Sequence, residues 1–443
     1  MRAAPRGRLR AHMGRILAQG LRSVRAEELM ARSLRLEGGN LSVGGHSFPV
    51  RGSIFVLAFG KAGLGMARAA ERLLGDAVGG GIAITPWVTG PSPSRISVRV
   101  GTHPSLSEEN VRATREAMRA VRRLGGQDIL LALISGGGSP LLCWPARGIS
   151  WREKDVTAQL LLRAGATIEE VNAVRKHLSR VKGGWLAKLA QPATVISLII
   201  SDVVGDDPSV IASGPTSPDP TTYEQALQAI RRRGVERRVP TRVLEHLRRG
   251  AQGQEPETPK PGDPIFARVH NFILANGLTA LRAMKNEAQR LGYRSLIITS
   301  HLRGEAREVA KAIASILISC RLRGEPLSAP ACLLFGGEST VRVRGKGRGG
   351  RNQELALSAA LELSGVHGVL LAALASDGVD GTSDAAGALV DGHSVRRALS
   401  LGLRPEAFLR RNDSHGLFSR LGDQLRTGPT GTNVGDLIVG LVA

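Results

Sequence analysis

Cysteine is scarce in this chain. Three occur among 443 residues, at Cys143, Cys320 and Cys332, and no two of them have the spacing of a CxxC pair. Neither a disulfide framework nor a thiolate metal site is therefore indicated. This usage fits a reducing compartment, and we expect a soluble protein of the cytoplasm.

Aromatic residues and long apolar runs are also rare. Aromatics make up 3% of the sequence, so the core must be built from Leu, Ile, Val and Ala, and apolar residues in total reach 42%, near the globular norm. No apolar run approaches the roughly 20 residues that span a bilayer, so we expect no membrane partner. A chain of 443 residues is too long for one ordinary core, and two or three domains are predicted.

Acidic residues are outnumbered, and the net charge is +22. Such a charge favours anionic partners: nucleic acid, an acidic surface or phosphorylated small molecules. A nucleic-acid binder should concentrate its basic residues on one face and add aromatic stacking groups. Here they spread along the chain, with small clusters at Arg231–Arg233 and Arg342–Arg351. We expect no specific nucleic acid, although a non-catalytic nucleic-acid-binding protein remains an alternative.

Strands and helices alternate from Ile54 onward. Apolar runs predict strands at Ile54–Phe59, Ile82–Thr85, Ser97–Val100, Ile129–Ile134, Ala193–Ile200, Asn271–Ala275, Ser295–Thr299, Ala331–Phe335, Thr340–Arg344, Gly368–Leu374 and Leu437–Val442. Helices are predicted at Ala67–Leu74, Asn110–Arg123, Leu278–Arg290, Glu305–Cys320 and Gln353–Leu363. The fold class is therefore α/β, with two three-layer α/β/α domains, the first around a mainly parallel sheet. A Pro-rich linker at 251–264 is expected to separate domains at 1–250 and 265–443.

Three glycine-rich loops directly follow predicted strands. They are Ser135–Ser139, Gly336–Ser339 and Gly345–Gly350, the last with basic residues interleaved. Glycine lets backbone N–H groups point inward to cradle phosphates, and ligands of parallel sheets collect at the carboxyl ends of strands. Tight turns without a ligand are the alternative for any one loop. Neither a Walker A sequence nor a protein-kinase signature is present.

Charged residues also follow strands. Lys61 comes directly after the first predicted strand and could reach a phosphate or a carboxylate, although a solvated loop lysine is the alternative. Carboxylates for Mg²⁺ could come from Asp202, Asp206, Asp207, Asp377, Asp380 and Asp384. Because Mg²⁺ takes one or two carboxylates besides phosphates and water, the others must be caps or turn formers. A lone histidine such as His103 is usually structural.

Together these loops resemble the glycerate 2-kinase family, also called class II glycerate kinases, whose C-terminal half is the MOFRL domain. The matching stretches are Phe59–Ala62, Thr102–Pro104, Ser135–Ser139, Asn172–His177, Ser201–Pro208, Ile211–Thr216, Gly336–Val341, Gly349–Glu354, Ser376–Gly381 and Thr427–Val434. Each motif is short, but ten occur in order through most of the chain. The resemblance implies a Rossmann-like N-terminal domain, a smaller MOFRL domain with a mixed sheet, and an active-site cleft between them.

It further implies ATP, Mg²⁺ or another divalent cation, and phosphorylation of D-glycerate, most often to 2-phosphoglycerate. Lys61 and Arg351 match the family's catalytic lysine and arginine, and Asp202 is our candidate to accept the hydroxyl proton. Candidates for substrate or phosphate binding are Ser135, Gly136, Gly137, Gly138, Ser139, Gly336, Gly337, Glu338, Ser339, Asn352, Glu354, Thr430 and Asn433. Candidate metal ligands are Asp377, Asp380 and Asp206. A homodimer is compatible with this interpretation.

A different enzyme class is the main alternative, because relatives in this family are sometimes labelled hydroxypyruvate reductase. An NAD(P)-dependent reductase should carry GxGxxG after its first strand and an acidic residue after its second. Gly60, Gly63 and Gly65 do not have that spacing, and the predicted strand Ile82–Thr85 contains no acidic residue. The sequence therefore favours the kinase.

Overall fold

The computed structural model describes residues 5–88 and 90–443 and has two compact units. The N-terminal unit comprises Leu29–Ser201 and Asp206–Leu274, and the C-terminal unit comprises 5–28, Asp202–Gly205 and Ala275–Ala443. This division differs from the predicted one, because the first described residues group with the C-terminal half and the Pro-rich segment lies inside the N-terminal unit.

A six-stranded sheet forms the centre of the N-terminal unit. Its order is β6 (Ile96–Val100), β5 (Val78–Thr85), β4 (Ile54–Phe59), β7 (Ile129–Ser135), β8 (Thr194–Ile200) and β9 (Val269–Ala275). The pairs from β6 to β8 are all parallel, as predicted. Every residue of β7 is buried, as a parallel strand covered on both faces requires. The strand β9 was predicted as part of the C-terminal domain, but it completes this sheet instead.

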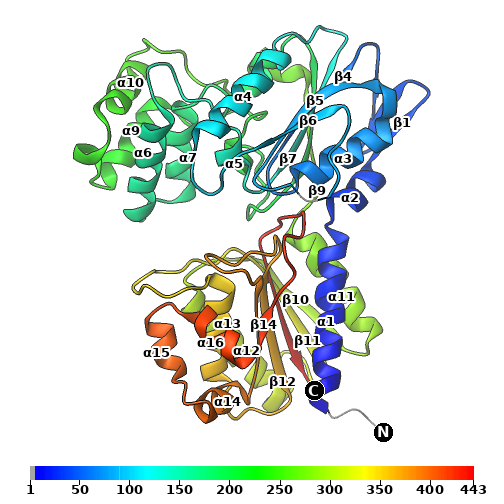
Figure 1. Ribbon diagram of the computed structural model, residues 1–443, viewed down its shortest axis with the longest axis vertical. Coiled ribbons are helices and arrows are strands. Elements are labelled where there is room, and N and C mark those ends of the chain that lie inside the picture. The colour runs from blue at the N-terminus through cyan, green and yellow to red at the C-terminus, as the bar shows by residue number, and fades with distance from the viewer. Residues whose placement is uncertain (1–4, 89) are drawn as a thin grey trace. The chain divides into compact units, whose positions relative to one another are not determined.

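Helices of the N-terminal unit fall into two sets. The helices α3 (Gly63–Leu74) and α4 (Glu108–Val121) pack on the sheet, and α2 (Ala26–Ser33), α5 (Gly138–Leu141) and α8 (Trp185–Ala190) are short. A separate cluster consists of α6 (Trp151–Arg163), α7 (Ile168–His177), α9 (Tyr223–Arg232) and α10 (Thr241–Ala251), which stand together in Figure 1. Capping boxes at Ser150, Thr167 and Thr222 fix where three of these helices begin.

A small antiparallel sheet precedes the parallel one. It consists of β1 (Leu34–Glu37), β2 (Asn40–Val43) and β3 (His46–Pro49). The two hairpin turns are the glycine pairs 38–39 and 44–45, all with positive φ. Two-residue hairpin turns need this left-handed backbone, which glycine adopts without a steric cost. The sequence analysis did not predict this sheet.

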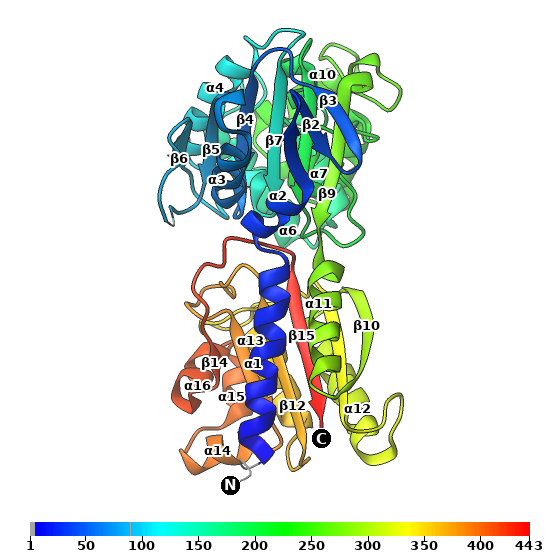
Figure 2. The same ribbon diagram turned by 90° about the vertical axis from the view of Figure 1, so that its right-hand side faces the viewer.

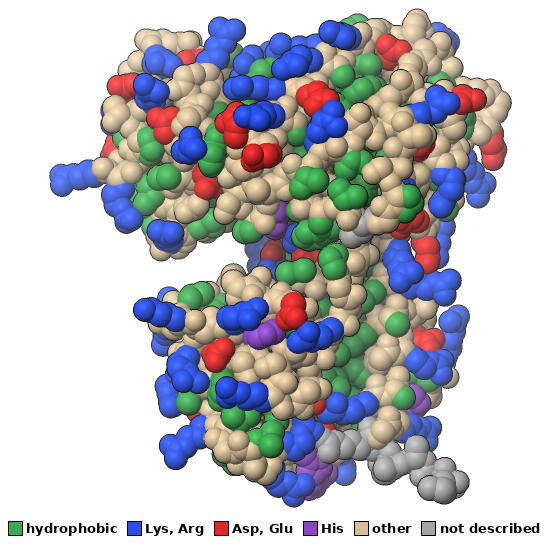
Figure 3. All heavy atoms as spheres, in the orientation of Figure 1, with side chains coloured by type: hydrophobic (Ala, Val, Ile, Leu, Met, Phe, Trp, Pro, Cys, Tyr) green, Lys and Arg blue, Asp and Glu red, His purple; other side chains and the backbone are tan. Residues whose placement is uncertain are grey.

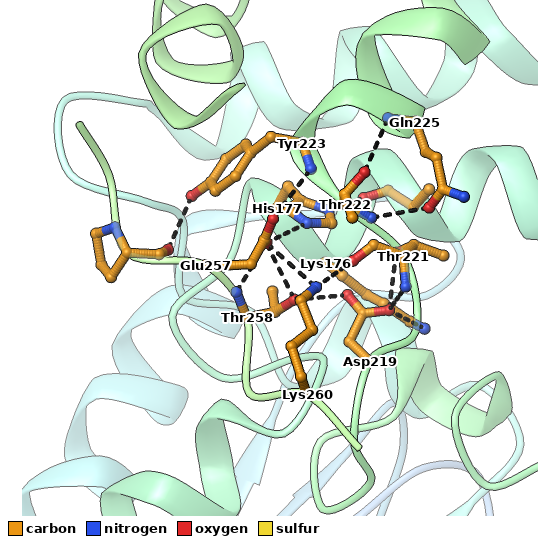
Figure 4. A network of polar contacts seen from close by, with 12 residues as sticks. Lys176, His177, Asp219, Thr221, Thr222, Tyr223, Gln225, Glu257, Thr258 and Lys260 are labelled. Carbon is orange, nitrogen blue, oxygen red and sulfur yellow. Dashed lines mark hydrogen bonds and ion pairs between the residues drawn. The ribbon is translucent and has the colours of Figure 1, made fainter. Parts of the chain in front are cut away.

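The Pro-rich segment predicted as an interdomain linker is instead held to the helical cluster (Figure 4). His177 on α7 bonds Ala173 O through Nδ1 at 2.7 Å and Glu257 Oε1 through Nε2 at 2.8 Å. Thr258 donates to Asp219 at 3.0 Å, and Lys176 donates to the same carboxylate at 3.0 Å. Composition suggested a flexible segment, but specific side-chain partners determine its conformation.

Replacing Glu257 with Gln should lower the stability of the N-terminal unit. Burial opposes ionisation of Glu257, but the hydrogen bond and charge of His177, the Thr258 N–H and Lys260 outweigh it and lower the pKa from 4.5 to about 2. The contribution is therefore complete above pH 4.5 and is lost as the pH falls towards 2. We expect a loss of about 1 kcal/mol at neutral pH, since this side chain is 37% exposed.

Thermal unfolding followed by calorimetry checks this expectation. The difference in melting temperature between Glu257→Gln and the parent should shrink as the pH falls through that interval. Glu236→Gln is the matched control, because Glu236 pairs with Arg248 at the surface and should contribute little. A Glu257→Gln deficit that stayed constant with pH would contradict the ion-pair explanation.

A mixed six-stranded sheet forms the C-terminal unit, as predicted. Its order is β10 (Arg294–Leu302), β11 (Ala331–Gly337), β15 (Asp436–Val442), β12 (Val369–Ala375), β13 (Gly387–Asp391) and β14 (Gln424–Leu425). Only β10 and β11 run parallel. The predicted strand at Thr340–Arg344 is wrong: Thr340 forms one isolated bridge to Glu305, and the residues after it are irregular.

Helices cover both faces of this sheet. Figure 2 shows α1 (Pro5–Ser23) lying along α11 (Gly277–Arg290), where Gly20 packs against Met284 and Arg15 pairs with Glu287 at 2.7 Å. A large apolar cluster joins α12 (Ala306–Arg323) and α13 (Arg351–Glu362) to the sheet. The short helices α14 (Ser394–Ser400), α15 (Pro405–Arg410) and α16 (Ser414–Leu421) complete the unit.

Basic side chains are scattered over the face seen in Figure 3 and form no single large patch there. This distribution matches the spread along the sequence. Among the described residues, no helix combines the length and hydropathy needed to cross a membrane.

Candidate active site

The parallel sheet changes its direction of growth between β4 and β7. The chain runs outward from β4 to β5 and β6, and then returns to place β7 on the other side of β4. The loops that follow β4 and β7 therefore leave in opposite directions, and such switch points are where α/β sheets bind ligands. Lys61 follows β4, and the predicted cradle Ser135–Ser139 follows β7.

These two loops are hydrogen-bonded to each other. The Lys61 N–H donates to Gly136 O at 2.9 Å, and the Ala62 N–H donates to the Ser135 hydroxyl at 2.9 Å. Gly60 has φ +114°, and a Cβ at this position would overlap Ser135. Ser135 is fully buried, so its hydroxyl acts within the protein to fix the two loops.

The side chains of Lys61 and His103 both lie close to the Cα of Gly137. A Cβ added to Gly137 would lie 3.1 Å from both Lys61 Cγ and His103 Nε2, and the φ of Gly137 is +77°. Glycine is therefore required here for two reasons, the backbone conformation and the closeness of two side chains. We predicted a structural role for His103 as a lone histidine, but the structure places it beside the candidate catalytic lysine.

A strained loop supports the last residue of the cradle. Ser139 and Ser213 share a hydrogen bond of 2.9 Å between their hydroxyls, and Ser213 also donates to Asn172 Oδ1 at 3.1 Å. Ala212 and Ser213 both have positive φ, at 50° and 64°. This conformation is unfavourable for residues with a Cβ and persists where the surroundings enforce it, most often at functional sites.

A buried lysine connects the cradle to that strained loop. Lys182 is 1% exposed, and its ammonium donates to Ser139 O at 2.8 Å and to Ala212 O at 3.3 Å. Burial, together with the charge of Lys154, lowers the pKa of Lys182 well below its ordinary value. Burial likewise lowers the pKa of Lys154 to about 8. The Lys182 amine therefore holds the cradle to the strained loop, whereas the Lys154 amine donates to the carbonyls of Arg175 and Leu178.

The second group of candidate residues lies at one edge of the mixed sheet. Because β15 runs antiparallel to β11 and β12, its first residue, Asp436, pairs with Gly337 and Ala375 at their ends. The predicted loops Gly336–Ser339 and Ser376–Gly381 leave the sheet at this edge. The N-terminus of α13 joins them there through the contacts of Arg351 and Asn352.

Arg351 is the first residue of α13, and two carboxylates hold its guanidinium. Nε donates to Asp436 at 2.9 Å and Nη1 donates to Glu338 at 2.6 Å. Burial would lower the pKa of Arg351, but the charges of Asp436 and Glu338 outweigh it and raise the pKa. The side chain is 30% exposed, and Nη2 has no hydrogen-bond partner among the described residues. The planar guanidinium group of Arg351 is thus fixed in orientation, and its Nη2 keeps N–H donors that can bind an anion.

Asp380 was predicted as a metal ligand, and the structure gives it a capping role. Its two carboxylate oxygens accept the N–H groups of Asn352 at 3.0 Å and Gln353 at 2.8 Å. Burial raises the pKa of Asp380 to about 6, against the effect of these hydrogen bonds. Burial also raises the pKa of Asp436. Two carboxylates therefore stabilise the start of α13, where helix N–H groups lack intrahelical partners.

Three buried polar atoms at this edge have no hydrogen-bond partner among the described residues. They are Asn352 Oδ1, Gln353 Oε1 and Ser339 Oγ. Such atoms are rare in native proteins and indicate a place where water, an ion or a ligand completes the bonding. No three His, Cys, Asp or Glu side chains stand together as a metal site in the part of the chain that the structure describes.

Two family models match the chain: the domain of unknown function DUF4147 at residues 12–248 and the MOFRL family at residues 331–436. A glycerate 2-kinase of Pyrococcus horikoshii is 40% identical over 429 residues, which cover 97% of this chain and 96% of that protein. The crystal structure of a glycerate kinase from Thermotoga maritima superposes with a TM-score of 0.84 at 37% identity, covering 99% of this chain and 100% of that one. The chain belongs to the glycerate 2-kinase family.

This confirms the resemblance drawn from the sequence motifs. The family also includes differently named members: a putative hydroxypyruvate reductase of Agrobacterium vitis is 43% identical over 389 residues, 87% of this chain and 86% of that protein. Names within the glycerate 2-kinase family thus point to two reactions, and the residues of the site must discriminate between them.

The remaining candidate residues have defined places in this family member. Glu354, expected to bind substrate or phosphate, is buried and accepts bonds from Arg307 at 2.6 Å and Asn412 at 3.0 Å. Asp377 accepts the Val379 N–H at 3.0 Å, and its backbone carbonyl accepts the Thr430 N–H at 3.1 Å. Glu354 and Asp377 therefore both organise loops.

Asp202 and Asn433 lie together in the C-terminal unit. Asn433 Nδ2 donates to Asp202 Oδ2 at 2.7 Å, so the amide orients the carboxylate that we predicted as a proton acceptor. Asp206, a predicted metal ligand, lies in the N-terminal unit with φ 55°, and Asp207 accepts the Ser209 N–H at 2.8 Å as a turn former.

Sequence reasoning missed Asp436 and Lys182. Both flank glycines with positive φ, Gly435 at 84° and Gly183 at 55°. The signal in the sequence that could have indicated these two residues is a charged residue next to a glycine, close to one of the motifs. Charge type alone does not reveal that Asp436 pairs with Arg351, because 85 residues separate them in the sequence.

Proposed function

We propose that this protein transfers the γ-phosphoryl group of ATP to D-glycerate and forms 2-phosphoglycerate. The observation that carries the proposal is full-length identity of 40% to a glycerate 2-kinase together with a fixed, partly exposed Arg351 whose fork suits a phosphate. All three cysteines are buried and form no disulfide, which is consistent with a protein of the reducing cytoplasm.

Catalysis in such a reaction rests on positioning and charge stabilisation, because the transition state is loose. We assign Arg351 to the charge on a phosphoryl or carboxylate group. Lys61, whose side chain passes Gly137, neutralises the transferring phosphoryl group or anchors the acceptor. Asp202, oriented by Asn433, accepts the hydroxyl proton late in the reaction.

A divalent cation fits the chemistry at the edge of the mixed sheet. The unpartnered oxygens of Asn352 and Gln353 are the kind of ligand that Mg²⁺ prefers, and nucleotide phosphates complete its usual coordination. Asp377 is the carboxylate we assign to it first, ahead of Asp380 and Asp206. The cation would neutralise charge on the phosphates, while Arg351 and Lys61 bind and orient the reactants.

Incubation with ATP, Mg²⁺ and D-glycerate, followed by phosphorus NMR of the product, tests the proposal. We expect the resonance of 2-phosphoglycerate and consumption of one ATP per product. Formation of 3-phosphoglycerate would overturn the regiochemistry alone, and hydrolysis of ATP without a phosphorylated acid would overturn the acceptor.

Hydroxypyruvate reduction is the second candidate, because the Agrobacterium vitis relative carries that name. The glycines after β4 do not have the dinucleotide spacing, and β5 ends in Thr85 without an acidic residue. Purified protein mixed with hydroxypyruvate and NADPH should leave the absorbance of the reduced cofactor unchanged.

A further inference from the structure

A second basic feature of the C-terminal unit is the irregular segment 341–350 that leads to α13. Every second residue from 342 to 348 is basic: Arg342, Arg344, Lys346 and Arg348. All four side chains are exposed. We call these four residues the basic strip.

Two glycines between the basic residues pack closely against the protein. A Cβ on Gly345 would overlap the backbone of Arg411, and a Cβ on Gly347 would overlap the backbone of Asp413. Both glycines therefore lie against the protein. Lys346 between them and Arg348 after them are exposed to solvent, as are Arg342 and Arg344 before them.

The backbone of the strip is fixed before any ligand binds. Asn412 Oδ1 accepts the N–H groups of Arg344 at 2.7 Å and Gly345 at 2.9 Å. The Gly347 N–H donates to Arg411 O at 3.0 Å, and the Arg348 N–H donates to Asp413 Oδ1 at 3.2 Å. Asn412 is in turn held by the buried carboxylate of Glu354. A segment of alternating glycines would otherwise lose much conformational freedom on binding.

The charges of the strip are uncompensated. None of its four basic side chains has an ion-pair partner among the described residues, whereas Arg307 and Arg351, close by, each bind a carboxylate. The charge of the strip is felt by a neighbouring residue. Burial lowers the pKa of His415, and the charge of Arg348 lowers it further. A row of unpaired cations on a rigid backbone is matched to a ligand with several negative charges in a row.

The geometry points to the basic strip as the docking site for the polyphosphate chain of the nucleoside triphosphate, which it would guide towards the N-terminus of α13. This assignment rests on the proposed kinase function and specifies which residues bind the donor. The four basic residues lie at alternate positions of one short segment and have long side chains, so neighbouring cationic groups can bind one triphosphate together. The strip recognises the negative charge of the phosphates and does not discriminate between nucleotide bases.

The test is direct binding of ATP to the full chain by isothermal titration calorimetry, without glycerate. The double variant Arg344→Gln/Lys346→Gln should bind ATP about tenfold more weakly, because two charge-assisted contacts are lost. Inorganic tripolyphosphate should displace ATP from the parent protein, and adenosine should not. The matched control is Arg237→Gln/Arg238→Gln, two exposed arginines of the N-terminal unit, which should bind ATP as the parent does.

Steady-state kinetics supply the second measurement. In the strip variant the KM for ATP should rise about tenfold, while kcat and the KM for D-glycerate stay within about twofold of the parent. Lys346→Arg should behave as the parent, because it keeps the charge. A rise in the KM for glycerate alone, or displacement of ATP by adenosine but not by tripolyphosphate, would overturn the assignment.

The binding measurement separates this proposal from the proposed function. If the parent protein binds ATP through the strip but phosphorylates no glycerate, glycerate is refuted as the acceptor, and the assignment of the strip as the ATP-binding site stands. A strip variant that binds ATP as tightly as a parent protein that phosphorylates glycerate would refute the strip and keep the kinase.

Discussion

Replacing Arg351 with Ala should reduce kcat for glycerate phosphorylation by about a thousandfold or more, the effect of removing an arginine that stabilises a transferring phosphoryl group. The structure explains why this arginine is effective. Asp436 and Glu338 bind Nε and Nη1 and so fix the plane of the guanidinium, while Nη2 is left for a ligand. Arg351→Lys keeps the charge but loses the fork, and we expect it to recover little of the activity.

The Arg351→Ala variant also leaves Asp436 buried beside no cation, which can reduce stability. The double variant Arg351→Ala/Asp436→Asn removes that charge and should regain the melting temperature without regaining activity. Arg290→Ala is the matched control on α11, because its side chain is 73% exposed and far from any candidate residue in sequence. An Arg351→Ala enzyme that is folded and turns over within tenfold of the parent would refute the catalytic role.

Replacing Lys61 with Ala is the second substitution with a large expected effect. We expect kcat to fall by about a hundredfold to a thousandfold, as for loss of a positioned group that stabilises developing charge. The fold should survive, since the side chain is only half-buried and the loop is held by the backbone bonds of Lys61 and Ala62. Stopped-time assays of product formation check the fall in kcat, and circular dichroism of the same samples checks that the fold is retained.

Arg72→Ala provides the control for Lys61, because Arg72 is an exposed cation on the helix that follows the same loop. It should leave kcat unchanged. Added ethylamine should restore part of the activity to Lys61→Ala, since a free ammonium can occupy the vacated space. Activity in Lys61→Ala equal to that of Arg72→Ala would show that Lys61 is a solvated loop residue.

Much of the fold was predictable because local pattern decides it. The run Ile54–Phe59 forms β4 at the predicted bounds, since a short run of six apolar residues followed by a glycine is typical of a strand buried on both faces of a sheet. The helical cluster was missed, because its mixed polar and apolar residues pack on a separate core that the central-sheet pattern does not reveal. The first antiparallel sheet was also missed.

Errors arose where composition and structure disagree. Pro-rich residues 251–264 have the composition of a linker, yet Glu257 and Thr258 bind α7 and the residues around Asp219. Thr340–Arg344 has a strand-like composition, but the next residues are glycines that pack against the backbone of Arg411 and Asp413. In both cases partners distant in sequence decided the conformation.

The sequence by itself determined the family, the strands of the two six-stranded sheets except β13 and β14, and the positions of the glycine-rich loops, because these depend on local residue order. The tertiary structure alone decided which partners each charged residue has. It gave Asp380 the N–H groups at the start of α13 and Glu354 the side chain of Asn412, and it placed His103 beside Lys61 and Asp436 beside Arg351. The physical reason is that a buried charge is defined by its partners, and those partners come from strands and helices far apart along the chain.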